Sequence, residues 1–319
     1  MASSPWLCPE LQRWPKMNRR AFLQNTVSVA TLVGFAPSLV AAEESASSAP
    51  KSAKRQLKKG IMWATIGVKG SVLERMKMVK EAGFDGVEMM SHMNQDEVIR
   101  GRDEVGLNVP SVCGAHHWSK PLSDPDPKVR EEGLEALKQT LRDAKRYGAS
   151  SVLLVPAVVN QRVSYQDAYT RSQAEIHKAV PLAEELGVKI AIENVWNQFL
   201  LSPLEAARYV DEFNSPAVGW HFDIGNVINY GWPEQWIRIL GKRIQKLHIK
   251  EYSRKKRDAE GPGKGFQVPY LEGDNNWPAV MQALDEIGYH GWGIAEQGGG
   301  DSPEGLKDLS DRMTKIFAS

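Results

Sequence analysis

The fold of this chain follows from the run VKIAIENVW (188–196), SPLEAARYVDEF (202–213), AVGWHFDIGN (217–226), PEQWIRILGKR (233–243) and IQKLHIKEY (244–252). The first, third and fifth segments are short, apolar and rich in β-branched residues, which is typical of buried strands. The second and fourth carry apolar residues at a period near 3.6, which indicates amphipathic helices. Strict alternation of this kind predicts a parallel sheet with right-handed crossovers.

The same alternation extends over residues 59–319. Further strand-like segments are KGIMWATIG (59–67), DGVEMM (85–90), NVPSVCGAHHW (108–118), SSVLLVPAV (150–158) and GWGIAEQ (291–297). Eight strands and eight helices in this length predict one closed (β/α)8 TIM barrel rather than an open doubly wound sheet. The first strand-to-helix turn has no G-x-G-x-x-G run, so the sequence gives no support to a dinucleotide cofactor.

Four successive strands near the C-terminus end in a potential metal ligand. These residues are Glu193, Asp223, His248 and Glu296. The carboxyl ends of parallel barrel strands lie on one face, so the four side chains are expected to converge there. Three carboxylates and one imidazole suit Mn²⁺, Mg²⁺ or Co²⁺; Zn²⁺ fits less well, because no cysteine lies nearby. Lys250 has the strand parity of His248, which makes it a further candidate at the mouth.

Other strand ends carry residues suited to binding a small substrate. Glu88 is predicted to bind substrate or to support a neighbouring histidine, and one of His116 and His117 is predicted to face the pocket. Trp63 and Trp196 can stack on a sugar ring, although packing at the barrel rim is an equally good use of tryptophan there.

The N-terminal segment is predicted to lie outside the barrel. Residues 1–42 comprise an upstream extension and, from Met17, an arginine pair (Arg19 and Arg20), an apolar stretch and small residues before position 43. This layout is typical of a cleaved twin-arginine signal peptide and predicts an exported, periplasmic protein; an attached amphipathic helix is the alternative. Residues 43–58 are rich in Ser, Ala and Lys, which predicts a disordered linker.

Composition narrows the range of partners. The net charge of +1 argues against nucleic acid as a partner. The apolar stretch of the leader is interrupted and short of about 20 residues, which argues against a stable membrane anchor. After cleavage Cys113 is the one cysteine left, which excludes a disulfide within the chain. A homo-oligomer is compatible with the sequence.

At its strand ends the chain resembles a known superfamily. Through IEN (192–194), FDIGN (222–226), LHIKEY (247–252) and AEQ (295–297) it is similar to the xylose-isomerase-like TIM barrels. The closest similarity within them is to the sugar isomerase/epimerase branch, which includes ketose 3-epimerases, hydroxypyruvate isomerases and inosose dehydratases. The resemblance covers residues 59–319.

The resemblance implies roles for individual residues. The four strand-end ligands would hold one divalent metal, and Glu193 and Glu296 would also move protons of the substrate. Arg254 stands six residues after the ligand histidine, where family members often hold a substrate oxygen. Asn226 departs from the ketose 3-epimerases, which commonly carry a substrate-contacting histidine there; asparagine can donate a hydrogen bond but does not titrate near neutral pH.

Three hypotheses for the function follow. The first is a metal-dependent isomerase or epimerase that acts on a small ketose or keto acid through a metal-bound enediolate. The second is a lyase or dehydratase of the same fold, in which this intermediate expels a leaving group from a keto-inositol or 3-keto-sugar; export and Asn226 favour it. The third is a non-catalytic carbohydrate-binding barrel, against which the four intact ligand positions count.

Overall fold

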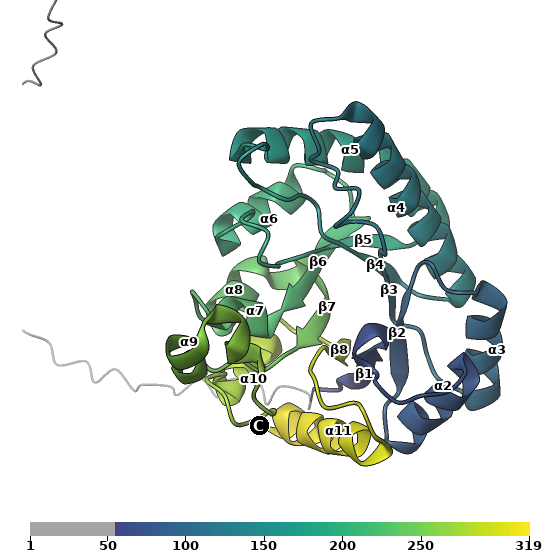
Figure 1. Ribbon diagram of the computed structural model, residues 1–319. Helices are drawn as coiled ribbons and strands as arrows, with labels where there is room; N and C mark the ends of the chain where they lie inside the picture. Colours follow the sequence, from purple (N-terminus) through teal and green to yellow (C-terminus); the bar gives the residue numbers. More distant parts are fainter. Residues whose placement is uncertain (1–54) are drawn as a thin grey trace, which may run out of the picture. The chain divides into compact units, whose positions relative to one another are not determined.

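The computed structural model describes residues 55–319, and its strands form a closed barrel. Strands β1 to β8 follow one another around the barrel in chain order, and each neighbouring pair is parallel (Figure 1). The strands are β1 (Lys58–Met62), β2 (Gly86–Met90), β3 (Ser111–Cys113), β4 (Ser151–Leu154), β5 (Lys189–Glu193), β6 (Val218–Asp223), β7 (Ile244–Ile249) and β8 (Trp292–Ala295). The predicted (β/α)8 TIM barrel is confirmed.

Helices form the outer ring around the strands (Figure 1). The α-helices are α2 (Val72–Glu81), α3 (Gln95–Val105), α4 (Pro127–Tyr147), α5 (Tyr165–Leu186), α6 (Pro203–Asp211), α7 (Ile224–Ile228), α8 (Pro233–Leu240), α9 (Arg254–Glu260), α10 (Trp277–Glu286) and α11 (Pro303–Ala318). The 3-10 turns are η1 (Trp63–Thr65), η2 (Gly241–Arg243) and η3 (Pro262–Phe266). Helices α7 and α9 add to the eight predicted helices, and with η3 they build the connections that follow β6 and β7.

Local sequence sets the helix ends. At the start of α2 the Ser71 hydroxyl accepts from the Glu74 amide, and the Glu74 carboxylate accepts from the Ser71 amide, which forms the capping box. Helices α4 and α5 stop at Gly148 and Gly187, whose φ values of 76° and 65° lie in the left-handed region that glycine adopts without a Cβ clash. These ends fix where each crossover returns to the barrel.

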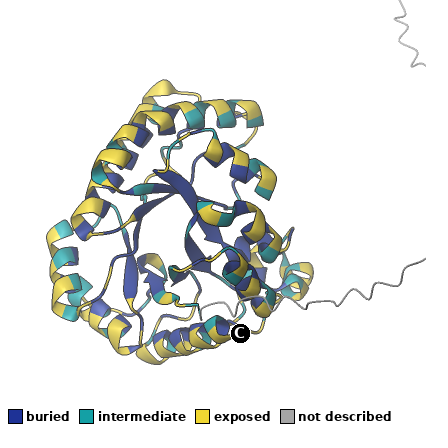
Figure 2. Ribbon diagram, turned by 180° about the vertical axis from the view of Figure 1, so that it is seen from behind, coloured by how far each residue is buried: buried dark blue, intermediate teal, exposed yellow. Residues whose placement is uncertain are grey.

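The strand register brings polar residues into the barrel interior at defined heights. Glu193 on β5 pairs with His221 on β6, and Asp223 pairs with His248 on β7. Side chains two apart on a strand share a face, so His221 lies one layer below Asp223. An apolar cluster packs inside the same barrel: Met62, Cys113, Leu153 and Ile294. Most strand residues are buried, whereas the outward faces of the helices are exposed (Figure 2).

Two segments differ from the predicted boundaries. β3 spans three residues rather than most of 108–118, because Pro110 has no amide hydrogen for the ladder and the chain turns after Gly114. The folded barrel begins before residue 59, because Lys58 opens β1 and the Arg55 guanidinium pairs with the Asp285 carboxylate at 2.8 Å. Residues 55–58 therefore belong to the barrel and not to the predicted linker.

The predicted leader (1–42) and most of the predicted linker (43–54) lie outside the described residues. Among residues 55–319, none of the helices is both long and apolar enough to cross a membrane.

Candidate metal centre

The four predicted ligands come together at the carboxyl ends of β5 to β8. Glu193 and Asp223 are the last residues of β5 and β6, His248 lies near the end of β7, and Glu296 follows β8 directly. One ligand atom from each residue lies within 4.8 Å of the other three. The first three side chains are buried, and that of Glu296 is 23% exposed toward the mouth. The convergence agrees with the expectation from strand order.

His248 lies at the centre of the group. Its Nδ1 is 2.9 Å from Glu193 Oε1, 3.0 Å from Glu296 Oε2 and 3.9 Å from Asp223 Oδ2. Three carboxylates around one ring nitrogen create a concentrated negative charge in a low-dielectric interior, which is costly without a cation.

The donor set fits a divalent cation. Carboxylate oxygens and one imidazole nitrogen are ligands that Mg²⁺, Mn²⁺ and Co²⁺ accept. Asp223 Oδ2 and Glu296 Oε2 are buried and receive no hydrogen bond from the described residues, although both make ion pairs. Asp223 Oδ1 accepts the Asn226 amide at 2.8 Å, so Oδ2, which is paired with Lys250, is the oxygen that could bind a metal. Asp223 Oδ2 and Glu296 Oε2 are therefore suitable metal ligands.

The surroundings shift the pKa values of the three carboxyl groups in different directions. Burial raises the pKa of Glu193 to about 7 against the opposing effect of His248. Burial raises the pKa of Asp223 to about 6, although the Lys250 ammonium opposes it. Burial also acts to raise the pKa of Glu296, but Lys250 and His248 outweigh it and hold that pKa well below its usual range. The group therefore contains carboxyl groups of unequal acidity.

Lys250 belongs to the site, as its strand parity suggested. Its Nζ lies 2.8 Å from Asp223 Oδ2 and 2.6 Å from Glu296 Oε2, and 5.2 Å from the centre of the Phe266 ring. Burial alone would lower the pKa of Lys250, but the nearby carboxylates dominate and raise it above its usual value. A permanent positive charge thus lies against two of the four candidate ligands.

Three residues that had no role in the sequence-based prediction hold the loops beside the candidate ligands in place through hydrogen bonds. They are Asn194, Glu251 and Gln297. Asn194 Oδ1 accepts the Asp223 amide at 2.9 Å, and its Nδ2 donates to the Asp223 carbonyl at 2.8 Å. The Glu251 carboxylate accepts amides of the loop after β7, and Gln297 donates to the carbonyls of Phe266 and Val268. Each of these three residues follows a candidate ligand by one to three positions, and this spacing is the signal in the sequence that could have identified them.

Asn226 and Trp196 lie next to the site. Asn226 Nδ2 donates to the Asn194 carbonyl at 2.9 Å, and Oδ1 faces Lys250 Nζ at 3.4 Å. The Trp196 indole donates to the Asn226 carbonyl at 3.0 Å, and its ring contacts Phe266 at a centroid distance of 4.9 Å. Asn226 is buried and Trp196 is partly exposed, and both lie beside the candidate ligands.

Arg254, expected to hold a substrate oxygen, binds the backbone instead. Its guanidinium donates to the carbonyls of Ile228 and Gly231 at 2.9 and 2.8 Å. It also lies over the Trp232 ring at 5.3 Å. These contacts tie the start of α9 to the connection after α7, so the structure does not bring Arg254 into the ligand group.

Neither histidine of the predicted pair contacts the four ligands. His116 is exposed in the loop after β3. His117 Nδ1 accepts the Val155 amide at 3.4 Å beside β4, and burial lowers the pKa of His117 to about 4. Both lie beyond β3 because that strand is shorter than predicted. Trp63 is mostly buried in η1, where the Arg75 guanidinium lies 3.8 Å from its ring centre, which agrees with the rim-packing alternative.

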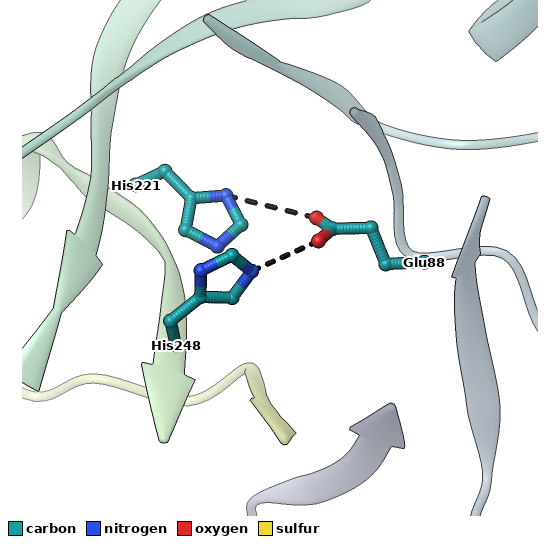
Figure 3. A group of neighbouring side chains, drawn as sticks. All are labelled: Glu88, His221 and His248. Carbon is teal, nitrogen blue, oxygen red and sulfur yellow. Dashed lines mark hydrogen bonds and ion pairs between the residues drawn. The ribbon is translucent and has the colours of Figure 1, made fainter. Parts of the chain in front are cut away.

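Glu88 lies beneath His248 rather than at the mouth. The side chain is wholly buried, and its Oε2 is 2.9 Å from His248 Nε2 (Figure 3). His221, which the sequence reading did not single out, faces the other Glu88 oxygen at 3.9 Å from its Nδ1 (Figure 3). Of the two roles foreseen for Glu88, support of a histidine agrees with this position, whereas direct substrate contact does not.

Comparisons with known proteins agree with this architecture. The L-ribulose-5-phosphate 3-epimerase UlaE of Escherichia coli O1:K1 is 27% identical over 233 residues, which cover 69% of this chain and 79% of UlaE. The solved 3-keto-D-glucoside 4-epimerase YcjR from E. coli superposes with a TM-score of 0.70 at 18% identity, covering 83% of this chain and all of YcjR. A D-psicose 3-epimerase from Clostridium cellulolyticum H10 superposes with a TM-score of 0.67 at 16% identity, covering 82% and 98%.

The family assignment rests on a longer match. The family model described as "Xylose isomerase-like TIM barrel" matches residues 76–316, which is more than half of the chain. The match spans all four candidate ligands. The chain therefore belongs to the xylose isomerase-like TIM barrel family.

Proposed function

We propose that this protein is a divalent-metal-dependent sugar isomerase or epimerase that acts on a small ketose or keto acid. The observation that carries the proposal is the convergence of Glu193, Asp223, His248 and Glu296 within 4.8 Å at the mouth of the barrel. The named relatives are sugar epimerases, which supports an enzyme of the isomerase class.

Glu193, Asp223, His248 and Glu296 would hold the cation. When bound, a divalent ion would polarise a substrate carbonyl and stabilise negative charge on its oxygen. Asn194 and Asn226 fix the Asp223 backbone and carboxylate, and His248 is packed inside the barrel. The chain thereby orients its ligands before a substrate arrives.

Glu193 and Glu296 are the groups we assign to proton transfer. They come from β5 and from the end of β8, with Asp223 and His248 on the two strands between them. One of the two would take a proton from the substrate carbon, and the other would return a proton, on the opposite face of that carbon or at its neighbour.

Lys250 supplies positive charge on the substrate side of Glu296. Because its Nζ lies 2.6 Å from Glu296 Oε2, a substrate oxygen beside that carboxylate would also meet the ammonium. A fixed cation stabilises negative charge that develops on such an oxygen. The partly exposed rings of Trp196 and Phe266, with centroids 4.9 Å apart, form an aromatic surface on which we place the sugar. The buried Tyr252 ring packs against both from behind.

A lyase or dehydratase acting on a keto-inositol or 3-keto-sugar is the second candidate. The observation that favours it is Asn226, whose amide hydrogen bonds to the Asn194 carbonyl and cannot take up a proton at neutral pH. Removal of the substrate proton by one of the two glutamates would be shared with the first candidate. The two differ in whether a leaving group departs before a proton returns.

Product analysis separates the two candidates. The protein is incubated in deuterated water with Mn²⁺ and a panel of ketoses, keto-inositols and 3-keto-glycosides, and the products are examined by NMR after removal of the metal. We expect deuterium at the reacting carbon with no change in substrate mass beyond the label. Loss of water or of an alcohol would favour the lyase, and no deuterium exchange with any substrate would contradict both.

A further inference from the structure

The imidazole of His248 lies between carboxylates on two levels of the barrel. Its Nδ1 faces Glu193 and Glu296 at the mouth, and its Nε2 is 2.9 Å from Glu88 Oε2 below (Figure 3). A histidine that binds a metal through Nδ1 carries its proton on Nε2, and that proton needs an acceptor. Among the described residues, Glu88 is the group within hydrogen-bond distance of Nε2.

Glu88 is itself held in one orientation. Its other oxygen, Oε1, accepts the Ser111 hydroxyl at 2.5 Å from the adjacent strand β3. Both side chains are completely buried, and a hydrogen bond in such an interior is electrostatically stronger than one exposed to solvent. A carboxylate with one oxygen on Ser111 and the other on His248 cannot rotate without breaking one of the two bonds.

His221 restrains the same ring from the side. The His221 and His248 rings lie 4.2 Å apart at an interplanar angle of 65°, an edge-on contact (Figure 3). His221 Nδ1 is 3.9 Å from Glu88 Oε1, which is too far for a hydrogen bond. Glu88 thus sets the direction of the Nε2–H bond, and His221 sets the plane of the ring.

We infer that Glu88 is a positioning residue for the metal centre: anchored by Ser111, it accepts the Nε2 proton of His248 and so presents the Nδ1 lone pair to the cation. The inference rests on the proposed function. A carboxylate behind a metal-binding histidine fixes its tautomer and strengthens it as a ligand, and loss of such a partner typically weakens metal binding by about 10- to 100-fold.

Two substitutions of Glu88 separate its acceptor oxygen from its size. Glu88→Gln retains an oxygen that can accept from Nε2, whereas Glu88→Met has a similar volume and no strong acceptor. We expect the Mn²⁺ dissociation constant, measured by titration calorimetry, to rise roughly 10- to 100-fold in Glu88→Met and by less in Glu88→Gln. Partial rescue by the amide would identify the hydrogen bond rather than packing as the cause.

Ser111 provides a second test with a matched control. Ser111 on β3 pairs in register with Ser151 on β4; both are fully buried, but no described residue hydrogen bonds to the Ser151 hydroxyl. Ser111→Ala should weaken Mn²⁺ binding, because it frees one oxygen of Glu88. Ser151→Ala removes the same atoms from the same layer and should leave Mn²⁺ binding unchanged. This pair keeps the inference falsifiable if Glu88→Met does not fold.

The tautomer provides a direct readout. In protein loaded with Mg²⁺, ¹⁵N–¹H correlation spectra should show His248 protonated at Nε2, with its signals assigned by their loss in His248→Gln. Glu88→Met should weaken or reverse this preference. If Glu88→Met folds and keeps the wild-type dissociation constant and tautomer, the positioning role of Glu88 is overturned. The proposed function would not be affected by that result.

Metal stoichiometry distinguishes the remaining outcomes. One ion per wild-type chain is the expected result of elemental analysis. Two ions per chain would also overturn the inference, because Glu88, His221 and His248 would then be ligands of the second ion. No ion on the wild-type chain would overturn the proposed function, and this inference with it.

Discussion

The two halves of the barrel make different contributions to the site. Strands β5 to β8 present Glu193, Asp223, His248, Lys250 and Glu296 at their carboxyl ends. Strands β1 to β4 supply mainly apolar side chains to the interior, among them Met62, Cys113 and Leu153. Among the ion pairs of the described residues, Glu88 is the one contact from β1–β4 to the four ligands.

This difference has a physical reason. A cation needs several negative ligands at one point, and ligands on adjacent parallel strands reach such a point without distorting the backbone. The apolar half lowers the local dielectric and excludes water, so each charge interaction in the other half becomes stronger. We therefore expect substitutions in β5–β8 to act on metal binding and catalysis. Apart from Glu88 and its partner Ser111, we expect substitutions in β1–β4 to act mainly on stability.

The largest effect is expected for Asp223→Ala. The substitution removes a ligand whose Oδ2 has no hydrogen bond and leaves Lys250 without one of its partners. Elemental analysis after Mn²⁺ soaking should fall from about one ion per chain to a small fraction, and the rise in melting temperature with Mn²⁺ should disappear. Asp211→Ala, which removes an exposed carboxylate paired with Arg243, is the control and should retain the ion. Full occupancy in Asp223→Ala would remove this residue from the ligand set.

Glu296→Gln should have the next largest effect. The amide retains an oxygen ligand but cannot take a proton, and loss of a positioned base typically costs about 10²- to 10⁴-fold in rate. We expect kcat to fall by that factor while metal content remains near that of the wild type. Glu272→Gln, on the exposed face of the loop after β7, should leave kcat unchanged. Near-wild-type turnover by metal-loaded Glu296→Gln would contradict the two-glutamate mechanism and direct attention to Lys250.

Leu153→Ala tests the expectation that apolar residues of β1–β4 contribute to stability rather than to metal binding. Leu153 is 2% exposed and packs inside the barrel with Met62, Cys113 and Ile294. Removing a buried leucine typically costs about 2–5 kcal/mol of unfolding free energy, and urea denaturation should show a loss in this range. The folded variant should still bind one ion with the wild-type dissociation constant. If it lost the metal while folded, the division between the two halves would be wrong.

The smallest expected effect is the change in Mn²⁺ affinity with pH. The pKa of Glu193 is raised to about 7 and that of Asp223 to about 6, chiefly by burial. Below these values protons occupy the ligand oxygens, so Mn²⁺ affinity should fall as the pH drops from 8 to 6, by roughly tenfold, with proton release on binding. Calorimetry in two buffers of different ionisation enthalpy measures the protons released. An affinity independent of pH in this range would show that both carboxyl groups are already ionised in the free protein.

The order of elements and the ligand strands could be read from the sequence. Alternation of strand and helix periodicity predicted the eight-stranded barrel. The four candidate ligands could be picked out because each lies at or beside the carboxyl end of a strand. Strand order alone places such residues on one face of a parallel barrel, whatever their side-chain conformations. The extent of β3 was less predictable, because an apolar run does not reveal where the backbone ladder ends.

The direction and partners of individual side chains were decided by the tertiary structure. Arg254 stands at the expected spacing from His248, yet its guanidinium is held by the carbonyls of Ile228 and Gly231. Glu88 is separated from His248 by 160 residues, and their contact depends on how closely two strands that do not pair, β2 and β7, approach each other across the interior. Periodicity specifies the face of a strand on which a side chain lies, but the closure and stagger of the barrel determine what that side chain meets across the interior.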